Sequence, residues 1–412
     1  MPSMEILPPL RQDIDILPVR QGEASLLLVR DPLGISAEGL ALRADIAQLF
    51  PFFDGTTSVT DLQLALAREA GGALISCEEI GDLVDQLDRV GLLQTERYRR
   101  AREEIVEDFS RKSVREAALA GSAYPSEPAK LADEIDGLLS PSGPLPTEAD
   151  GRAAPSAVVA PHIDFRVSGT SYGSAYRPLR SLSPPAVLLL GTGHSLESPF
   201  SLTEKTFQTP LGKVSSDREA VRRLREAGGE AVAREDFAHR SEHSIEFQLL
   251  FLQRLFPMEK IPIVPLLCGS LESFLLLEKN PLEDPEMARF IVELRRWLAE
   301  PPAGKLVVAG VDFSHVGPKF GDDAPAKALE EEFRAEDRRL LGILERADAE
   351  AFYDAVASTG NRFKVCGFSA LWTLLALLPG AEGKVLDYRV WHEEGTRSAV
   401  SFASITFRAP EA

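Results

Sequence analysis

The chain has 412 residues, of which 44% are hydrophobic and 26% are charged, and its formal net charge is −18. This composition supports a folded core and excludes disordered and fibrous proteins, while the length indicates two domains or one large domain with an appendage. The acidic balance repels phosphate backbones and anionic lipids, so we expect no binding to nucleic acid or to membranes. Three cysteines, at positions 77, 268 and 366, cannot build a disulfide framework and favour a reducing compartment.

Neither a membrane span nor an export signal is expected. The longest apolar stretch, ALWTLLALL at 370–378, is much shorter than the roughly 18 residues that a bilayer requires. The first residues, MPSMEILPPLRQDID, have no basic region followed by an apolar one. We therefore expect a cytoplasmic protein.

Residues 1–110 are expected to form a small α+β domain. Ser76 and Glu79 have the spacing of a capping box ahead of an apolar stripe, and Thr60 and Gln63 have the same spacing. The predicted elements are a strand over 26–30, a helix over 40–50, a helix from residue 57, a helix that Gly91 ends, and a β wing beginning at Leu92 and Leu93. Residues 96–120 are predicted to form a charged helical connector.

This outline is that of a winged helix. Through FFDGTTSVTDL and LDRVGLL it resembles the PqqD-like peptide-recognition domains that accompany radical-SAM enzymes. The first 110 residues hold ten Lys and Arg against twenty Asp and Glu, which is the wrong charge for reading DNA. We expect either a module that docks a peptide or a radical-SAM partner protein, or a structural appendage.

Residues 111–412 are expected to form an α/β domain in which helices enclose a largely parallel sheet. Short apolar runs bounded by turn residues have the pattern of strands buried on both faces, and helical stretches alternate with them. A loop rich in Pro, Gly and Ser is predicted over 140–156. The predicted strands are 157–160, 186–190, 261–267, 305–311, 384–390 and 399–407, and the predicted helices are 218–226, 245–255, 287–298 and 326–346.

Three of the six histidines closely follow a predicted buried strand: His162, His194 and His315. Ligands bind at the carboxyl ends of the strands in open α/β sheets, so these imidazoles are expected to converge. His162 and His194 are separated by about one βαβ unit, which predicts neighbouring strands. Converging imidazoles are metal ligands or acid–base groups.

A carboxylate or thiolate beside the histidines would complete a transition-metal site. The candidates for this third ligand are Cys366, a carboxylate of the SEHSIEF segment (Glu242 or Glu246), and Asp312. His243 and Glu246 are three residues apart on a predicted helix, so both are expected to face the same crevice. Ser195 and Ser314 do not lie in a G-x-S-x-G elbow, which argues against a serine hydrolase, and no glycine-rich phosphate loop is present, which argues against nucleotide binding.

Eight blocks in order carry a resemblance to a known family: AGSAYPSEPAKL, VVAPHIDFRVSG, LLLGTGHS, FQTPLGKVSSD, EHSIEFQLLFLQ, VPLLCGS, VDFSHVG and VCGFSALWTLL. From about residue 121 to 407 the chain resembles the Memo family, whose bacterial members are called AmmeMemoRadiSam system protein B. The resemblance implies a fold like that of the class III extradiol dioxygenases. It also implies that His162, His194 and Cys366 are metal ligands, that His315 is an acid–base group, and that Asp312 and His243 neighbour the site.

The chain departs from this family at several positions. APHIDF stands where the family usually has APHAGY, which places a carboxylate, Asp164, near the site as a further candidate ligand. GTGHS replaces GPSHH, and CGFSAL replaces CGRxPI. The implied ligands are present, but the residues around them differ, so the substrate of relatives is not transferred.

Three functions remain open on the sequence. The first is a nonhaem-iron redox enzyme, with Fe(II) at His162, His194 and Cys366 and copper as the competing metal, that acts on a small molecule or a modified peptide. The second is a non-catalytic peptide- or protein-binding module that uses the same pocket. The third is a metal-assisted hydrolase, for which Asp164 or Glu246 would be the base.

Overall fold

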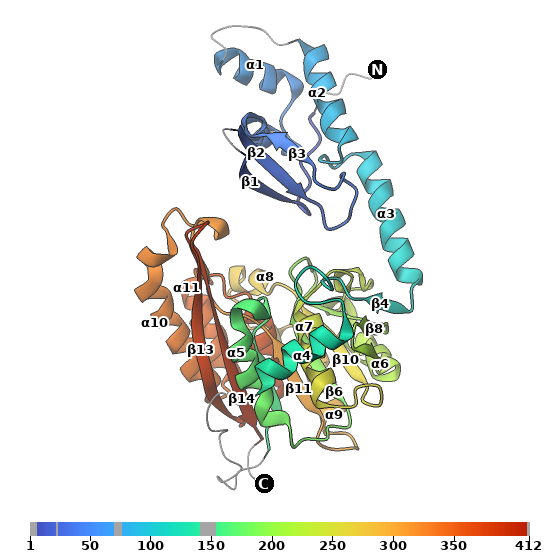
Figure 1. The fold of residues 1–412 in the computed structure, drawn as a ribbon. Coiled ribbons are helices and arrows are strands. Elements are labelled where there is room, and N and C mark those ends of the chain that lie inside the picture. Colours follow the sequence, from blue (N-terminus) through green and yellow to red (C-terminus); the bar gives the residue numbers. More distant parts are fainter. Residues whose placement is uncertain (1–5, 22–23, 70–75, 141–153, 410–412) are drawn as a thin grey trace. The chain divides into compact units, whose positions relative to one another are not determined.

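The computed structural model describes residues 6–21, 24–69, 76–140 and 154–409. The chain divides into two compact units, residues 1–111 and 112–412 (Figure 1). The part of the loop predicted over 140–156 that covers residues 141–153 lies outside the described residues. No helix in the described ranges is long and apolar enough to cross a bilayer.

The N-terminal unit packs helices against a small antiparallel sheet with the order β1-β2-β3. Its buried apolar side chains come mainly from α2 and from the segments before and after it, including Leu7, Phe53, Leu92 and Leu93. The elements are β1 (Asp15–Gln21), β2 (Ala24–Arg30), β3 (Ala41–Arg43), the 3-10 helix η1 (Ala44–Phe52), α1 (Val59–Glu69), α2 (Cys77–Arg89) and α3 (Glu96–Arg111).

The structure confirms one local prediction for this unit and corrects several others. The capping box of Ser76 and Glu79 is confirmed at the start of α2. At α1 the reciprocal pair is instead Ser58 with Asp61, because α1 begins at Val59. Residues 40–50 form a short strand and a 3-10 helix rather than an α-helix. In place of a wing strand, Leu93 makes a single bridge to Leu10.

The predicted connector over 96–120 ends earlier than expected, because α3 stops at Arg111 and a strand follows it in the C-terminal unit. The strands of this unit are β4 (Val114–Glu116), β5 (Ala157–Ala160), β6 (Val187–Thr192), β7 (Phe200–Leu202), β8 (Thr206–Thr209), β9 (Gly212–Val214), β10 (Ile263–Cys268), β11 (Leu306–Gly310), β12 (His315–Val316), β13 (Glu382–Glu393) and β14 (Ser398–Arg408). Its helices of more than one turn are α4 (Pro128–Leu139), α5 (Phe165–Tyr176), α6 (Arg218–Gly228), α7 (Ser244–Leu255), α8 (Glu272–Leu276), α9 (Pro285–Ala299), α10 (Ala326–Leu344), α11 (Ala349–Thr359) and α12 (Phe368–Leu377).

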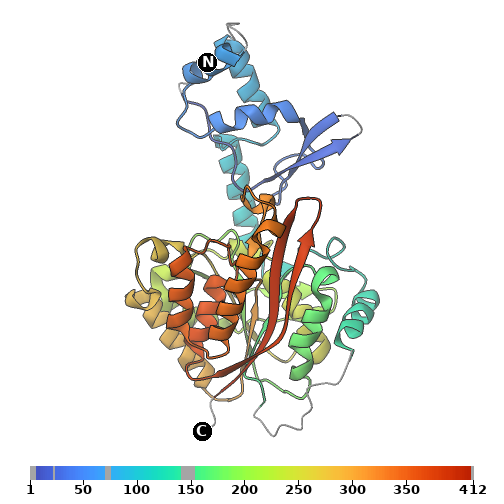
Figure 2. The same ribbon diagram turned by 90° about the vertical axis from the view of Figure 1, so that its left-hand side faces the viewer.

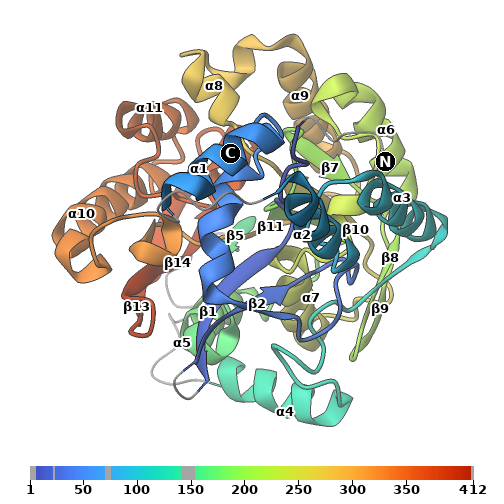
Figure 3. The ribbon, with the colours of Figure 1, turned by 90° about the horizontal axis from the view of Figure 1, so that it is seen from above.

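Within the described residues, the main sheet has the order β12-β14-β5-β11-β6-β10-β7, with β13 paired to the outer side of β14. Figure 3 shows β13, β14, β5 and β11 of this sheet from above. The pairs β5–β11, β11–β6 and β6–β10 are parallel, and the pairs of β7, β12, β13 and β14 are antiparallel. The prediction of a largely parallel sheet therefore holds for its centre only. Figure 2 shows the long β13–β14 hairpin, in red, along one side of the unit.

Helices cover both faces of this sheet, as strands that are buried on both faces require. Alternate residues of one strand point to opposite faces, so Val158 and Ala160 of β5 pack with α4, α5 and α7. Ala157 and Val159 of the same strand belong to the other core, with α6, α9, α10, α11 and α12. The chain thus forms a mixed α/β domain whose four central strands all end at the same edge.

Candidate functional site

The carboxyl ends of three parallel strands bring the candidate residues together. β11 lies between β5 and β6, so the strands that carry His162 and His194 are not neighbours, contrary to the prediction. Each strand is followed within two residues by one polar side chain of the site: His162 after β5, His194 after β6 and Asp312 after β11. The central strand therefore contributes the carboxylate between two histidines.

His162 is fixed in a single ring orientation. It is buried, with 3% of its surface exposed, and its Nδ1 lies 3.0 Å from the carbonyl oxygen of Gly310. A carbonyl can only accept, so Nδ1 carries the proton and Nε2 keeps a free lone pair. Burial, followed by the charges of His194 and His243, lowers the pKa of His162 well below its ordinary value, so this ring is neutral at pH 7.

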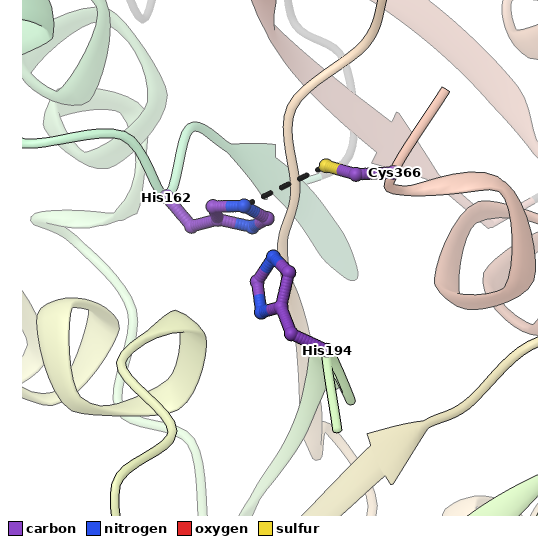
Figure 4. Close-up of side chains that lie close together, drawn as sticks. All are labelled: His162, His194 and Cys366. Carbon is purple, nitrogen blue, oxygen red and sulfur yellow. Dashed lines mark hydrogen bonds between the residues drawn. The ribbon is translucent and has the colours of Figure 1, made fainter. Parts of the chain in front are cut away.

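Cys366 faces this free nitrogen. Its Sγ lies 3.6 Å from Nε2 of His162 and 3.5 Å from the carbonyl oxygen of Asp312 (Figure 4). The loop before α12 is held there because the N–H groups of Cys366 and Gly367 donate to the carbonyls of Phe313 and Asp312. Burial raises the pKa of the Cys366 thiol, so a metal that binds it must displace a proton.

His194 points toward the same place from the other side (Figure 4). Its ring centre is 5.0 Å from that of His162, and its Nδ1 lies 2.9 Å from Oε2 of Glu242. Burial lowers the pKa of His194, but the charge and hydrogen bond of Glu242 outweigh this effect and the pKa is raised overall. Burial likewise raises the pKa of Glu242, yet its hydrogen bonds and the neighbouring histidines bring the pKa below its usual range.

His243 stacks on His194 at the start of α7. The two ring centres are 5.1 Å apart with an angle of 13°, and Nδ1 of His243 lies 3.3 Å from Oε1 of Glu242. Burial lowers the pKa of His243. The ring centre of His162 is 5.2 Å away, so three imidazoles share one small volume.

Asp312 and His315 occupy the segment after β11. The Asp312 carboxylate accepts the backbone N–H of His162 at 3.1 Å and lies 3.7 Å from its Nε2. Burial raises the pKa of Asp312 to about 7. In His315, Nδ1 lies 3.0 Å from the carbonyl of Phe313, and burial lowers the pKa to about 4, so its ring is neutral at pH 7.

Two of the carboxylates considered as third ligands lie outside this cluster. Glu246 is fully buried and binds Arg115, the hydroxyl of Tyr124 and the N–H groups of Ala118 and Leu119. It therefore does not share a crevice with His243, because its partners draw it toward β4. Asp164 caps α5 through the N–H of Arg166 and pairs with the side chain of that residue.

Two groups of side chains in the described residues have the spacing of metal ligands. One is His162, His194 and Cys366, and the other is His194, Glu242 and His243; in each group the ligand atoms lie within 4.8 Å of one another. In the first group, Nε2 of His162 faces the Cys366 thiol at 3.6 Å, and the thiol lies 3.5 Å from the carbonyl oxygen of Asp312, so a metal can replace the thiol proton between sulfur and nitrogen. Two imidazoles and a thiolate suit iron, copper or zinc, so these residues fit the metal that the sequence resemblance implies.

The contact of Glu242 with His194 was not predicted, although Glu242 was considered as a ligand. The signal that points to it is the Glu-His pair at the start of a predicted helix, where free backbone N–H groups attract a carboxylate. The sequence alone does not show which strand end lies opposite that helix start.

Comparison with known proteins assigns the chain to a sequence family. The sequence model of the family described as Memo-like protein matches residues 115–406. The chain belongs to the Memo family. Its relatives include a MEMO1 family protein of Aquifex aeolicus, which is 32% identical over 384 residues, covering 92% of this chain and 95% of the relative.

Two further Memo relatives extend the comparison. A MEMO1 family protein of Thermus thermophilus is 31% identical over 81% of this chain and 94% of its own length. One of Thermococcus kodakarensis is 30% identical over 72% of this chain and 99% of its own length. The C-terminal unit thus corresponds to nearly the whole of the Thermococcus protein in size, and the Aquifex alignment is long enough to extend into residues 1–111.

Proposed function

We propose that this Memo protein binds one Fe(II) ion through His162, His194 and Cys366 and acts as a nonhaem-iron redox enzyme on a small molecule or a modified peptide. The observation that carries the proposal is the convergence of one ligand atom from each residue within 4.8 Å at a single edge of the sheet. When bound, such an ion supplies one-electron chemistry and Lewis acidity. Copper is the competing metal, because thiolate and imidazole also suit Cu(I).

The surrounding residues supply proton transfer. Asp312 has a pKa of about 7 and lies 3.7 Å from Nε2 of His162, so near neutral pH it holds or releases a proton beside the ligand set. His315 keeps a neutral imidazole on the same segment and is the second acid–base candidate. The hydrolase alternative is disfavoured, since Glu246 and Asp164, its candidate bases, are engaged by Arg115 and Arg166.

Metal analysis of the full chain, purified without oxygen, tests this proposal. We expect about one equivalent of iron in the unsubstituted protein and none in His162→Ala or Cys366→Ala. His392→Ala and Cys77→Ala are matched controls, because His392 lies near Glu330 and Cys77 is exposed, and both should retain the metal. If the protein contains copper instead of iron, the proposed metal is wrong but the proposed ligands stand. Full metal retention in both site variants would contradict the proposal.

The second candidate is a binding function, in which the pocket recognises a peptide or protein without turnover. It is favoured by the acidic N-terminal unit, which carries no histidine and resembles PqqD-like domains, and which would dock a peptide or a radical-SAM partner. Oxygen consumption distinguishes the two functions. Steady uptake of O2 by the iron-loaded protein with a phenol such as hydroquinone supports the enzyme, and its absence across a panel of phenols supports the binder.

A further inference from the structure

Glu242 is the most heavily engaged carboxylate next to the candidate ligands. Its side chain is 6% exposed, and each of its oxygens has its own set of donors. Oε2 lies 2.9 Å from Nδ1 of His194 and accepts the backbone N–H of the same residue at 3.3 Å. Oε1 accepts the N–H groups of His243 at 2.8 Å and Ser244 at 2.9 Å, at the start of α7. One side chain therefore joins the end of β6 to the beginning of α7.

The contact with Glu242 determines which nitrogen of His194 is free. An ionised carboxylate only accepts hydrogen bonds, so Nδ1 of His194 carries the proton and Nε2 keeps its lone pair. The carbonyl of Gly310 does the same for His162. Both imidazoles thus offer Nε2 to a metal. The Nδ1 of His162 is held by a neutral backbone carbonyl, whereas that of His194 is held by a charged carboxylate, which increases the basicity of the His194 ring.

Glu242 could instead be read as a ligand of a second ion, together with His194 and His243. The hydrogen bonds argue against this. Three backbone N–H groups already point at the two oxygens, and they cannot turn away without unwinding the start of α7 or the end of β6. A cation at this position would be repelled by the partial positive charges of these N–H groups.

We propose that Glu242 is a positioning residue for His194: it fixes the ring with Nδ1 protonated, directs Nε2 to the metal, and thereby raises metal affinity. This inference rests on the proposed metal site. It assigns Glu242 no contact with the metal or with substrate, and it makes the start of α7 part of the metal-binding apparatus.

Glu242→Gln tests the inference because a glutamine has only one acceptor oxygen. It cannot accept hydrogen bonds both from Nδ1 of His194 and from the N–H groups at the start of α7. If its carbonyl oxygen faces the helix N–H groups, its NH2 group meets Nδ1 of His194, which must then accept and move its own proton to Nε2. We expect metal affinity, measured by competition with a chelator, to fall by about 10- to 100-fold. Glu242→Asp keeps the charge but is one methylene too short to reach both sides, so it should give an intermediate loss.

Asp284→Asn is the matched control. Asp284 likewise accepts two backbone N–H groups at a helix start, that of α9, but touches no histidine. This variant should bind metal like the unsubstituted protein. Unchanged affinity in Glu242→Gln, alongside loss of metal in His162→Ala, would overturn the inference and leave the proposed function standing. Two equivalents of metal in the unsubstituted protein, falling to one in Glu242→Gln, would identify Glu242 as a ligand and also overturn it.

A metal-free measurement keeps the inference testable even if the proposed function fails. Nitrogen NMR of the full chain with labelled histidine reports which ring nitrogen carries the proton. At a pH high enough for the ring to be neutral, we expect the Nδ1-protonated form for His194 in the metal-free protein and a shift toward the Nε2-protonated form in Glu242→Gln. The same tautomer in both proteins would overturn the positioning role.

Discussion

Among the described residues, each of the two units has one buried arginine, and the two arginines serve different purposes. In the N-terminal unit, Arg11 binds Asp31 and Asp13 and donates to the carbonyl of Gly91, so it joins the segments before β1 and after β2 to the end of α2. In the C-terminal unit, Arg115 binds Glu246, which is fully buried. The first arginine holds a small core together, and its partner Asp13 still reaches water with a side chain that is 33% exposed.

Arg115 also lies behind the candidate site. Its guanidinium donates to the carbonyl oxygens of His239 at 2.9 Å and Glu242 at 2.7 Å, the second of which belongs to the residue that holds His194. A buried ion pair is weak evidence for stability in itself, but removing one partner leaves an uncompensated charge. Loss of Arg11 should therefore lower only the stability of its unit, whereas loss of Arg115 should lower both stability and the metal affinity of the site.

The largest effect is expected for Arg115→Met. Glu246 would become an unpaired buried charge, so the free energy of unfolding of the C-terminal unit should fall by about 3–5 kcal/mol. Urea denaturation measures the change. Adding Glu246→Gln removes the stranded charge and should recover part of the loss, whereas a double variant as unstable as the single one would contradict this account.

Arg11→Met should destabilise the N-terminal unit by less, about 2–3 kcal/mol, because the lost hydrogen bonds are to charged groups but one carboxylate remains hydrated. Metal uptake by the C-terminal unit should stay unchanged. Denaturation followed together with chelator competition checks both statements. A fall in metal affinity in this variant would contradict the conclusion that only Arg115 supports the site.

Acid should affect the N-terminal unit through Asp31. Burial raises the pKa of this carboxyl, but Arg11 and the N–H groups of Ser36 and Leu33 outweigh it and lower the pKa to about 2. A folded-state pKa below the unfolded value stabilises the protein above about pH 4, and this contribution is lost as the pH falls toward 2. The loss should amount to about 2–3 kcal/mol. Thermal unfolding at pH 5, 4 and 3 should show it, and Asp31→Asn should have a flatter profile.

The smallest effect is expected for Ser76→Ala. This substitution removes the side-chain acceptor of the capping box at α2, which costs about 1 kcal/mol. The melting temperature of the N-terminal unit should fall by a few degrees. A drop as large as that of Arg11→Met would show that α2 depends on its cap more than on the buried arginine.

The sequence predicted the central strands well, because four or more consecutive apolar residues between turn residues have few other solutions. It missed α5, whose glycines hide the helical pattern: a Cβ on Gly173 would lie 2.3 Å from the carbonyl oxygen of Leu138, so this face needs small residues for close packing. The short strands β7, β8 and β9 were missed because three or four residues carry too little pattern.

In the site, the strand-end argument placed His162 and His194 at one edge, but for the third strand it named His315, whereas the polar side chain that directly follows β11 is Asp312. Spacing was misleading for Glu246, which shares a helical face with His243 in the sequence but is drawn away by Arg115, 131 residues earlier in the chain. A partner so distant in sequence leaves no local pattern. The role of Glu242 was missed for the same reason.

The position of β14 has a consequence for how the protein is made. This strand has the highest residue numbers in the sheet, yet it lies inside it, between β13 and β5. During synthesis β5 therefore emerges from the ribosome long before its neighbour and waits with one edge unpaired. His162, which follows β5, has its neighbours in Gly310 and Cys366, so the metal-ligand set can form only after both of these later segments have been synthesised.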